Sequence, residues 1–203
     1  MSKTQQGTTL RERCIEESLR IIAKDGVTNL SIREVARRLG VSHGAPYRHF
    51  ANRDALLTEI AILGLGILHE YVLSDVDYEN RPPKDNFLQV CRNYIRFAME
   101  QHDYFQLILW TELPNSTEEY PALQAEANKV FRIVSTLIQQ IKNRPGNPRP
   151  EDQLAVLHVF STIHGYASLM SSGKMSVFDY SLQDLEDSAD SIAELLYSSH
   201  ANG

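Results

Sequence analysis

The clearest pattern of apolar and polar positions lies between residues 31 and 50, where it predicts two short helices joined by a tight turn. In the first helix the apolar residues share one face and the arginines point elsewhere. Ser31 is a suitable N-cap, and Glu34 completes the pattern of a reciprocal capping box. Gly40 supplies the left-handed residue that ends this helix, and Ser42 caps a second one over about 43–49. This pattern is typical of a helix-turn-helix, whose second helix enters a DNA major groove.

The rest of the chain also shows helical periodicity, and polar, proline-containing stretches separate the segments. No segment shows the alternation of a strand bounded by turns. The sequence therefore predicts an all-α chain of about nine helices. An N-terminal three-helix helix-turn-helix domain is expected over residues 1–54, followed by a C-terminal helical bundle over residues 55–203. The helices outside the pair are expected at about 9–24, 52–74, 85–101, 102–112, 117–142, 151–171 and 182–199.

Charge is distributed unevenly along the chain. Of its 203 residues, 42% are hydrophobic and 23% charged, which is ordinary for a globular protein long enough to bury a core. A net charge of −6 argues against a nucleic-acid partner when the chain is taken as a whole. Residues 1–54, however, hold ten Lys and Arg against six Asp and Glu, so they carry +4 and the remainder carries −10. A basic module on an acidic body fits DNA binding, although +4 also arises by chance.

The cysteines and the apolar segments indicate the compartment. Cys14 and Cys91 stand outside any CxxC or Cys/His cluster, so free buried thiols in a reducing cytoplasm are expected, with a redox switch as the alternative. The first ten residues lack the apolar core of a signal peptide. The most apolar window, 60–68, is too short for a bilayer, so no membrane association is expected. Gly64 and Gly66 within it are expected to permit close helix packing.

Little in the chain resembles an enzyme site, although seven histidines invite a metal or catalytic interpretation. His158 and His164 lie six residues apart, so they leave a helix in different directions, unlike a metal-binding pair four apart. No HExxH sequence, nucleophile elbow or glycine-rich phosphate loop is present. We therefore expect no catalytic residue, no metal and no cofactor. The rival hypothesis of a helical enzyme predicts a tightly bound cofactor or metal in the purified protein.

The N-terminal quarter carries a further set of marks. They are Asp25-Gly26 after an amphipathic helix, Thr28, the run SIREVARRLGVS, Tyr47-x-His49-Phe50 and Asn52-Arg53-Asp54-x-Leu56-Leu57. On these marks, residues 10–57 resemble the DNA-binding domain of the TetR family of bacterial transcriptional regulators. The chain departs from the family's pattern at Ala45 and Pro46, where Thr and Leu, or similar residues, usually precede the tyrosine. The alternative is a helix-turn-helix shape in an unrelated helical protein.

The resemblance implies which side chains contact DNA. Tyr47 and His49 are expected to hydrogen-bond phosphates, the alternative for Tyr47 being a packed aromatic residue. Arg53 follows the cap Asn52, where the helix dipole disfavours a cation, so we expect a DNA phosphate there, with compensation by Asp54 as the alternative. Base edges are expected to meet Ser42, His43, Gly44 and Ala45. Secondary contacts are expected from Thr28, Ser31, Arg33 and Arg37, the two arginines being solvent-facing charges in the alternative.

Two later segments, NYIRFAMEQHDYFQLILW and FSTIHGYASLMSSG, resemble more weakly the ligand-sensing domain of one TetR subgroup. His164 and Gly165 match the subgroup's His-Gly motif. Aromatic residues on helices usually belong to a core, but a pocket between these helices is the expected effector site. Its expected lining is Tyr94, Phe97, Phe105, Trp110, Phe131 and His164.

The last two helices resemble the family's dimerisation pair. Their small and apolar residues form a helical stripe that is expected to pack against a second copy, or within the chain in the alternative. The stripe comprises Leu185, Ser188, Ala189, Ile192 and Leu196.

Taken together, these features predict a cytoplasmic, homodimeric transcriptional regulator. It is expected to bind a palindromic operator in double-stranded DNA, and to act as a repressor that a small apolar effector releases. The alternative is a constitutive helix-turn-helix DNA binder whose bundle serves only assembly or a protein partner.

Overall fold

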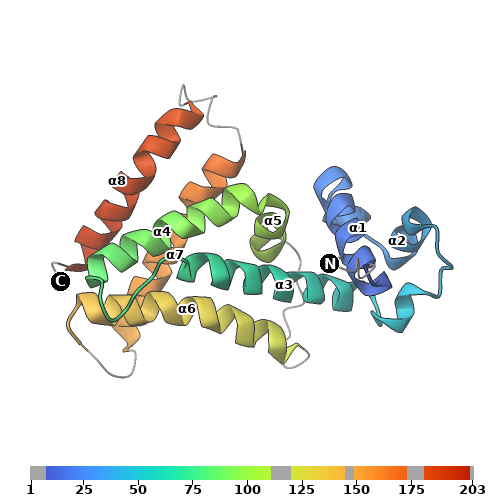
Figure 1. Ribbon diagram of the computed structural model, residues 1–203, viewed down its shortest axis with the longest axis horizontal. Helices are drawn as coiled ribbons and strands as arrows, with labels where there is room; N and C mark the ends of the chain where they lie inside the picture. The colour runs from blue at the N-terminus through green and yellow to red at the C-terminus, as the bar shows by residue number, and fades with distance from the viewer. Residues whose placement is uncertain (1–7, 111–119, 145–148, 173–180, 202–203) are drawn as a thin grey trace, which may run out of the picture.

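The computed structural model describes residues 8–110, 120–144, 149–172 and 181–201, and it leaves the side chains of 109, 110 and 182–187 undescribed. Over these ranges the chain forms eight α-helices and two short 3-10 helices without a strand, which confirms the all-α prediction. Figure 1 shows a small N-terminal head joined to a larger helical body by one long helix, α3. The elements are α1 (Leu10–Asp25), η1 (Val27–Asn29), α2 (Ile32–Leu39), η2 (Pro46–Arg48), α3 (Arg53–Leu73), α4 (Pro83–Glu100), α5 (His102–Trp110), α6 (Pro121–Ile141), α7 (Pro150–Ser172) and α8 (Leu182–Ala201).

The head has its own apolar core. Thr9 caps α1 through a complete capping box, in which the Glu12 N–H donates to Thr9 Oγ1 over 3.2 Å and the Thr9 N–H donates to the Glu12 carboxylate over 2.7 Å. Gly40 ends α2 in the left-handed conformation with a φ of +66°, as its position predicted. The buried apolar residues of this core are Cys14, Ile15, Ile21, Leu30, Ile32, Val35, Phe50, Leu56, Leu57, Ile60 and Leu107.

Only half of the predicted capping box forms at the start of α2. The Glu34 N–H donates to Ser31 Oγ over 3.1 Å, so Ser31 is the N-cap. The Glu34 carboxylate, however, accepts hydrogen bonds from Arg37 and Arg38 rather than from the backbone of Ser31. Hydrogen bonds between ionised groups are stronger than those to a neutral amide, which explains the exchange of partners.

Helix α3 belongs to both cores. Asn52 caps it by accepting the N–H three residues later over 2.7 Å. Leu57 and Ile60 lie in the core of the head, whereas Leu65 and Leu68 lie in the core of the body. The core of the head therefore extends past residue 54, into the first turns of α3. A displacement of this helix affects the packing of both parts.

The apolar segment of α3 is longer than the window of residues 60–68 that the sequence indicated. Its 21 residues include a window with a mean hydropathy of 1.6, so the helix is long and apolar enough to cross a membrane. The expectation that this segment is too short to cross a bilayer is therefore wrong. It was based on residues 60–68 alone, whereas the apolar helix has 21 residues. Half of the window is buried inside the protein. That burial is typical of a core helix that packs in two domains.

The body consists of α4, α6, α7 and α8 around the rest of α3, with α5 beside the head (Figure 1). Two ion pairs join α4 to α8: Arg92 to Asp190 at 2.5 Å and Lys84 to Glu194 at 2.9 Å. Helices α4, α6 and α7 each begin with a proline. Helices α4 and α7 begin two residues and one residue before the predicted starts, and α6 begins four residues after its predicted start. Proline suits a first helical position because the N–H it lacks has no partner there.

Both cysteines are free and buried, as predicted. Cys14 lies in the core of the head, and Cys91 lies in the core of the body. Burial raises the pKa of Cys91 to about 12 and also raises the pKa of Cys14. Thiols that remain protonated at neutral pH are poor nucleophiles, which argues against a redox switch.

Candidate DNA-binding surface and effector cavity

The recognition segment is a series of tight turns rather than the predicted α-helix over 43–49. The Ala45 N–H donates to the Ser42 carbonyl over 2.9 Å, and the His49 N–H donates to the Pro46 carbonyl over 2.9 Å. Pro46 has no N–H, so it cannot make the bond to the Ser42 carbonyl that would begin an α-helix. The carbonyl accepts from Ala45 instead, and the chain follows the narrower 3-10 geometry of η2.

Two buried residues anchor this segment and leave the side chains between them in solvent. Pro46 and Phe50 are buried in the head. Tyr47 is 47% exposed, and Arg48 and His49 are exposed beside it. The packed-aromatic alternative for Tyr47 is therefore wrong, because its ring lies outside the core of the head. Arg48 was missed by the sequence analysis, since the expected α-helix would have turned it away from its two neighbours.

The residues before the first anchor complete the exposed strip. Ser42, His43 and Gly44 are exposed, whereas Ala45 is half-buried. From 42 to 49 the strip carries hydroxyl, imidazole and guanidinium groups and no carboxylate. Such groups can donate hydrogen bonds to phosphate oxygens and to base edges.

The secondary candidates lie on the segments leading to this strip. Thr28 in η1 and Arg33 in α2 are exposed. Ser31 is exposed as well, but its hydroxyl already accepts the Glu34 N–H as the cap of α2. Arg33 forms no salt bridge within the described part of the chain, so its guanidinium is available to an external anion.

The guanidinium of Arg53 is partly engaged within the head. Its Nε donates to the Leu30 carbonyl over 3.1 Å, and a terminal nitrogen donates to the Val27 carbonyl over 2.9 Å. The Asp54 carboxylate lies 3.7 Å from the other terminal nitrogen. Carbonyls at the two ends of η1 thus stabilise the cation that the α3 dipole disfavours. These contacts give Arg53 a structural role, the attachment of α3 to η1, and the phosphate contact stays a prediction.

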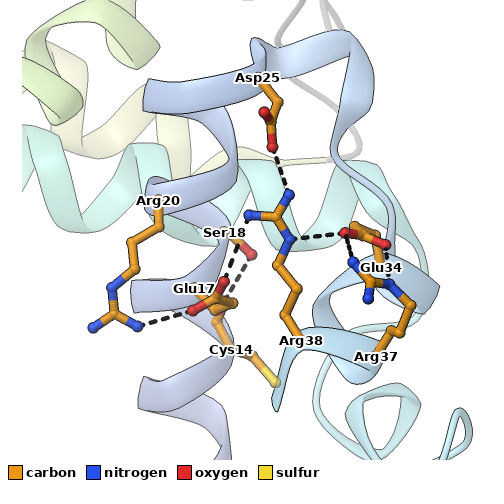
Figure 2. A network of polar contacts seen from close by, with 8 residues as sticks. All are labelled: Cys14, Glu17, Ser18, Arg20, Asp25, Glu34, Arg37 and Arg38. Carbon is orange, nitrogen blue, oxygen red and sulfur yellow. Dashed lines mark hydrogen bonds and ion pairs between the residues drawn. The ribbon is translucent and has the colours of Figure 1, made fainter. Parts of the chain in front are cut away.

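Arg38 is the centre of an ion network that joins α1 to α2 (Figure 2). Its guanidinium lies 2.5 Å from Asp25, 2.7 Å from Glu34 and 3.8 Å from Glu17. Arg37 adds a bidentate pair with Glu34, at 2.7 and 2.8 Å. Hydrogen bonds from Arg37 and then Arg38 lower the pKa of Glu34 to about 2. Both arginines are therefore paired within the head, which makes Arg37 a weaker candidate for DNA than Arg33 or Arg48.

In the body, His164 is the polar centre of an aromatic cluster. Its Nδ1 lies 3.1 Å from the Tyr94 hydroxyl, and its Nε2 lies 3.3 Å from Ser168 Oγ. Phe160 stacks on the imidazole with ring centroids 5.7 Å apart, and Phe105 lies beside it at 5.2 Å. Burial lowers the pKa of His164 and raises that of Tyr94. Both groups are therefore held in their neutral forms at pH 7.

The residues predicted to line the effector pocket lie in different environments. Tyr94, Phe105 and His164 come together as expected. Phe97 is a fully buried core residue, packed on Phe105 and Tyr71. The side chain of Trp110 lies outside the described residues.

Phe131 is 40% exposed on α6 and reaches the cluster only through Phe160, with ring centroids 5.3 Å apart. Phe160 was not among the predicted lining residues, although it precedes His164 by four residues and so shares its helix face. A void of about 30 Å³ adjoins the cluster, between α3, α4, α6 and α7. Among its lining residues are Val72, Cys91, Tyr94, Ile133, Val159 and Phe160.

The stripe predicted for dimerisation packs inside the chain. Leu196 is buried in the core of the body, and Ala189 and Ile192 pack against it. Ser188 is hydrogen-bonded to the Tyr166 hydroxyl over 2.8 Å, and the side chain of Leu185 lies outside the described residues. The intramolecular alternative is therefore confirmed for the four residues of the stripe whose side chains the structure describes.

The exposed apolar residues of α7 and α8 lie on other faces of these helices. Leu154 and Leu157 on α7 are 68% and 55% exposed, and Leu169, about three to four turns further along, is 47% exposed. Leu195 on α8 is 68% exposed. Exposed leucines on neighbouring helices are typical of a surface that a partner covers.

Helix α5 connects the aromatic cluster to the head. Phe105 lies in the core of the body beside His164, whereas Leu107 on the same helix is fully buried in the core of the head. Tyr104 packs against both cores. A change at His164 can therefore reach the head through one short helix as well as through α3.

Gly64 allows α5 to lie close to α3. A Cβ added there would stand 2.9 Å from Tyr104 Cδ1 and 2.9 Å from Ile108 Cδ1. At Gly66 an added Cβ would meet nothing within 4 Å. The predicted close approach is thus confirmed at Gly64 and not at Gly66.

In the described part of the chain, no group of three or more His, Cys, Asp and Glu side chains is arranged to hold a metal ion. The arrangement offers hydrogen-bond donors on the head and, in the body, an apolar cavity next to a cluster that contains one neutral histidine. Donors on a surface and an apolar cavity are both features of binding sites.

Comparisons with known proteins agree with this geometry. Residues 15–60 match the family described as "Bacterial regulatory proteins, tetR family", and residues 87–196 match "Tetracyclin repressor-like, C-terminal domain". The uncharacterised HTH-type transcriptional regulator YerO of Bacillus subtilis is 26% identical over 127 residues, which are 60% of this chain and 44% of YerO. The chain spans about half the length of the curated relatives it matches.

Solved structures share the fold over nearly the whole chain. A tetR-family regulatory protein from Rhodococcus RHA1 matches with a TM-score of 0.76 and 16% identity, covering 96% of this chain and 98% of that one. AibR in complex with isovaleryl coenzyme A and operator DNA matches with a TM-score of 0.69 and 17% identity, covering 92% of this chain and 97% of AibR. With both domains matched and the all-α fold shared, the chain belongs to the TetR family of DNA-binding transcriptional regulators.

Proposed function

We propose that the protein is a cytoplasmic repressor that binds a palindromic operator as a homodimer and leaves it when a small molecule enters the body. The observation that carries this proposal is the continuity of α3 and α5 through both cores. Because side chains of each helix pack in the head and in the body, a ligand that shifts either helix changes the position of the head. A bundle that served assembly alone would have no need of this double packing.

The proposed DNA contacts come from the exposed strip of the head. Tyr47, Arg48 and His49 are exposed there and hydrogen-bond phosphates in this proposal, and Arg33 on α2 adds a second cation. Base edges meet the side chains of Ser42 and His43, whereas Gly44 and Ala45 contribute shape. Thr28 and Ser31 lie at the edge of this surface. The charge of +4 on residues 1–54 attracts the phosphate backbone, and the acidic body helps to orient the approach.

The proposed dimer interface is the exposed apolar face of α7 and α8, marked by Leu154, Leu157, Leu169 and Leu195. Two helices from each copy would cover these leucines in a four-helix arrangement. Two heads related by a dyad then meet half-sites about one turn of DNA apart. This interface replaces the stripe that packs inside the chain.

The proposed effector site is the cluster of Tyr94, Phe105, Phe160 and His164. It combines apolar walls with a neutral hydrogen-bonding pair, which is the usual make-up of a small-molecule site. The AibR structure, which has the same fold, contains isovaleryl coenzyme A together with operator DNA. A ligand affects the DNA-bound arrangement only through its different affinity for the two arrangements of the protein.

A two-step binding experiment tests the proposal. DNA sequences selected from a random library by the purified protein identify the operator, and fluorescence anisotropy then measures its affinity in the presence of candidate effectors. An effector should weaken operator binding roughly 5- to 150-fold, the range of ordinary allosteric coupling. A protein that selects a sequence but responds to no small molecule would be the constitutive binder. A protein that selects no sequence would contradict the assignment of the head to an operator.

A further inference from the structure

We infer that the effector is an anionic amphiphile, whose alkyl chain enters the body while its charged head is held outside by Arg132 and Lys129. This inference rests on the proposed effector site and names the chemical class of its ligand. It follows from a groove on the surface of the body, the charges that line it, and its relation to the inner void.

The groove lies between α6 and α7 and has a volume of about 690 Å³, within the range of small-molecule sites. Its walls combine apolar surface from Phe131 and Val156 with the side chains of Lys129 and Arg132. An alkyl chain and a charged group can therefore be accommodated side by side. An apolar compound without a charge would leave the cationic wall unused.

The charge of the groove is positive. Arg132 is exposed and forms no salt bridge within the described residues, whereas Lys129 is paired with Glu126 at 2.6 Å. Among the described residues that line the groove there is neither Asp nor Glu. Arg132 is therefore the principal anion ligand, because its guanidinium is unpaired and can bind a carboxylate or phosphate in a bidentate manner.

A pair of contacting rings lies between the groove and the inner void. Phe131 lines the groove, Phe160 lines the inner void, and their ring centroids are 5.3 Å apart. The void of about 30 Å³ is walled by apolar side chains, and empty apolar cavities of this kind stay dry and accept apolar groups. Displacement of Phe160 enlarges the void for an alkyl chain. The same displacement disturbs the ring that stacks on His164, next to α5.

Titration calorimetry on the full-length protein tests the inference with three probes of equal chain length: decanoate, decanoyl coenzyme A and 1-decanol. The first two share an anionic head but differ in its source, a free carboxylate against a nucleotide phosphate, whereas the third has no charge. At least one anionic probe should bind about tenfold more tightly than 1-decanol, the effect of one charge-assisted hydrogen-bond pair. Hexanoate should bind more weakly than decanoate, since it buries fewer methylene groups.

Two matched variants locate the anion site. Arg132→Gln should remove most of the preference for the anionic probe and leave the affinity for 1-decanol unchanged. Arg144→Gln makes the same change of charge after the end of α6 and should behave as the wild type. Equal binding of 1-decanol and the anionic probes, equal effects of the two variants, or no binding of any probe would each overturn the inference.

Operator affinity, measured on the same samples, separates this inference from the proposed switch. If decanoate binds through Arg132 while the protein stays on DNA, the ligand class is correct and the switch is wrong. If another compound releases the operator while no decanoyl anion binds, the switch is correct and the ligand class is wrong.

Discussion

At the scale of single residues, the exposed strip of the head depends on Pro46. Without an N–H at this position, the segment tightens into 3-10 turns and directs Tyr47, Arg48 and His49 to solvent. Phe50 then returns to the core. A short, rigid turn between two buried anchors presents its polar groups in a fixed arrangement, which favours the contact of several of them with one DNA backbone.

The contribution of the Tyr47 hydroxyl can be measured by its removal. Tyr47→Phe should weaken operator binding by about 1 kcal/mol, the usual contribution of one hydrogen bond, because the exposed ring itself is retained. Tyr78→Phe, at another exposed tyrosine in the loop between α3 and α4, should have no effect. Gel-shift titration compares the two variants. Equal affinities would remove Tyr47 from the DNA-binding surface.

Arg53 should behave as a structural residue. Arg53→Gln removes hydrogen bonds from a charged donor to the carbonyls of Leu30 and Val27, so we expect a loss of about 1–3 kcal/mol in the free energy of unfolding. The dependence of DNA affinity on salt should keep its slope. Arg48→Gln should show the opposite behaviour, with unchanged stability and a slope reduced by about one. A reduced slope at unchanged stability in Arg53→Gln would restore the phosphate contact.

His164 should make stability sensitive to pH in one direction. Burial lowers its pKa in the folded state below the ordinary value, so between the two pKa values the unfolded chain holds more protons than the folded one. The free energy of unfolding should therefore fall as the pH drops through about 6.5, and level off below the folded pKa. His200, whose pKa is also lowered, contributes in the same direction.

Urea denaturation from pH 8 to pH 5 isolates the contribution of His164. His164→Gln should show a shallower loss of stability than the wild type, and the exposed His102→Gln should match the wild type. A loss of stability in His164→Gln as steep as in the wild type would mean that the folded protein does not disfavour the charged imidazole.

At the scale of elements, α5 is the link that sequence periodicity could not reveal. Phe105 and Leu107 are two positions apart on an apolar segment, and nothing in the sequence assigns one to the body and the other to the head. The close approach at Gly64 was predictable as packing, but its partners Tyr104 and Ile108 follow only from the fold. Helix α3 and its cap Asn52 were predictable, because capping and periodicity are local properties.

A pair of glycine variants tests the junction of α3 and α5. Gly64→Ala introduces a Cβ 2.9 Å from side-chain atoms of Tyr104 and Ile108, so these side chains or α5 itself must shift, at a cost of about 1–3 kcal/mol in stability. Gly66→Ala meets nothing and should be neutral or stabilising, since alanine favours a helix. Thermal unfolding compares the two variants. If α5 carries the signal, Gly64→Ala should also change the effect of an effector on DNA affinity.

A Gly64→Ala protein as stable and as responsive as Gly66→Ala would contradict the close packing. The result would also remove α5 as a route between the effector site and the head, and leave α3 as the connection.

At the scale of the whole molecule, the sequence correctly predicted the all-α class and the family, because the head carries a dense set of local marks. The sequence did not predict which apolar helix faces pack inside the chain, because that depends on contacts between segments far apart in the sequence. The stripe of Ala189, Ile192 and Leu196 has the periodicity of an interface, yet it packs on the chain's own core. Both an interface and a core select apolar residues at helical spacing, so periodicity alone cannot tell them apart. The exposed leucines of α7 and α8 became apparent only from the fold.

The measurement that tests the central claim most directly is the affinity of the protein for its selected operator, compared with the same DNA after one half-site is scrambled. For two heads on one dimer, loss of a half-site should weaken binding by at least tenfold, since half of the contacts are lost. Leu157→Glu, which places a charge on the proposed interface, should yield monomers that bind both DNAs equally weakly, whereas Leu63→Glu on α3 should behave as the wild type. Equal wild-type affinity for the intact and the scrambled operator would contradict the proposed dimeric regulator.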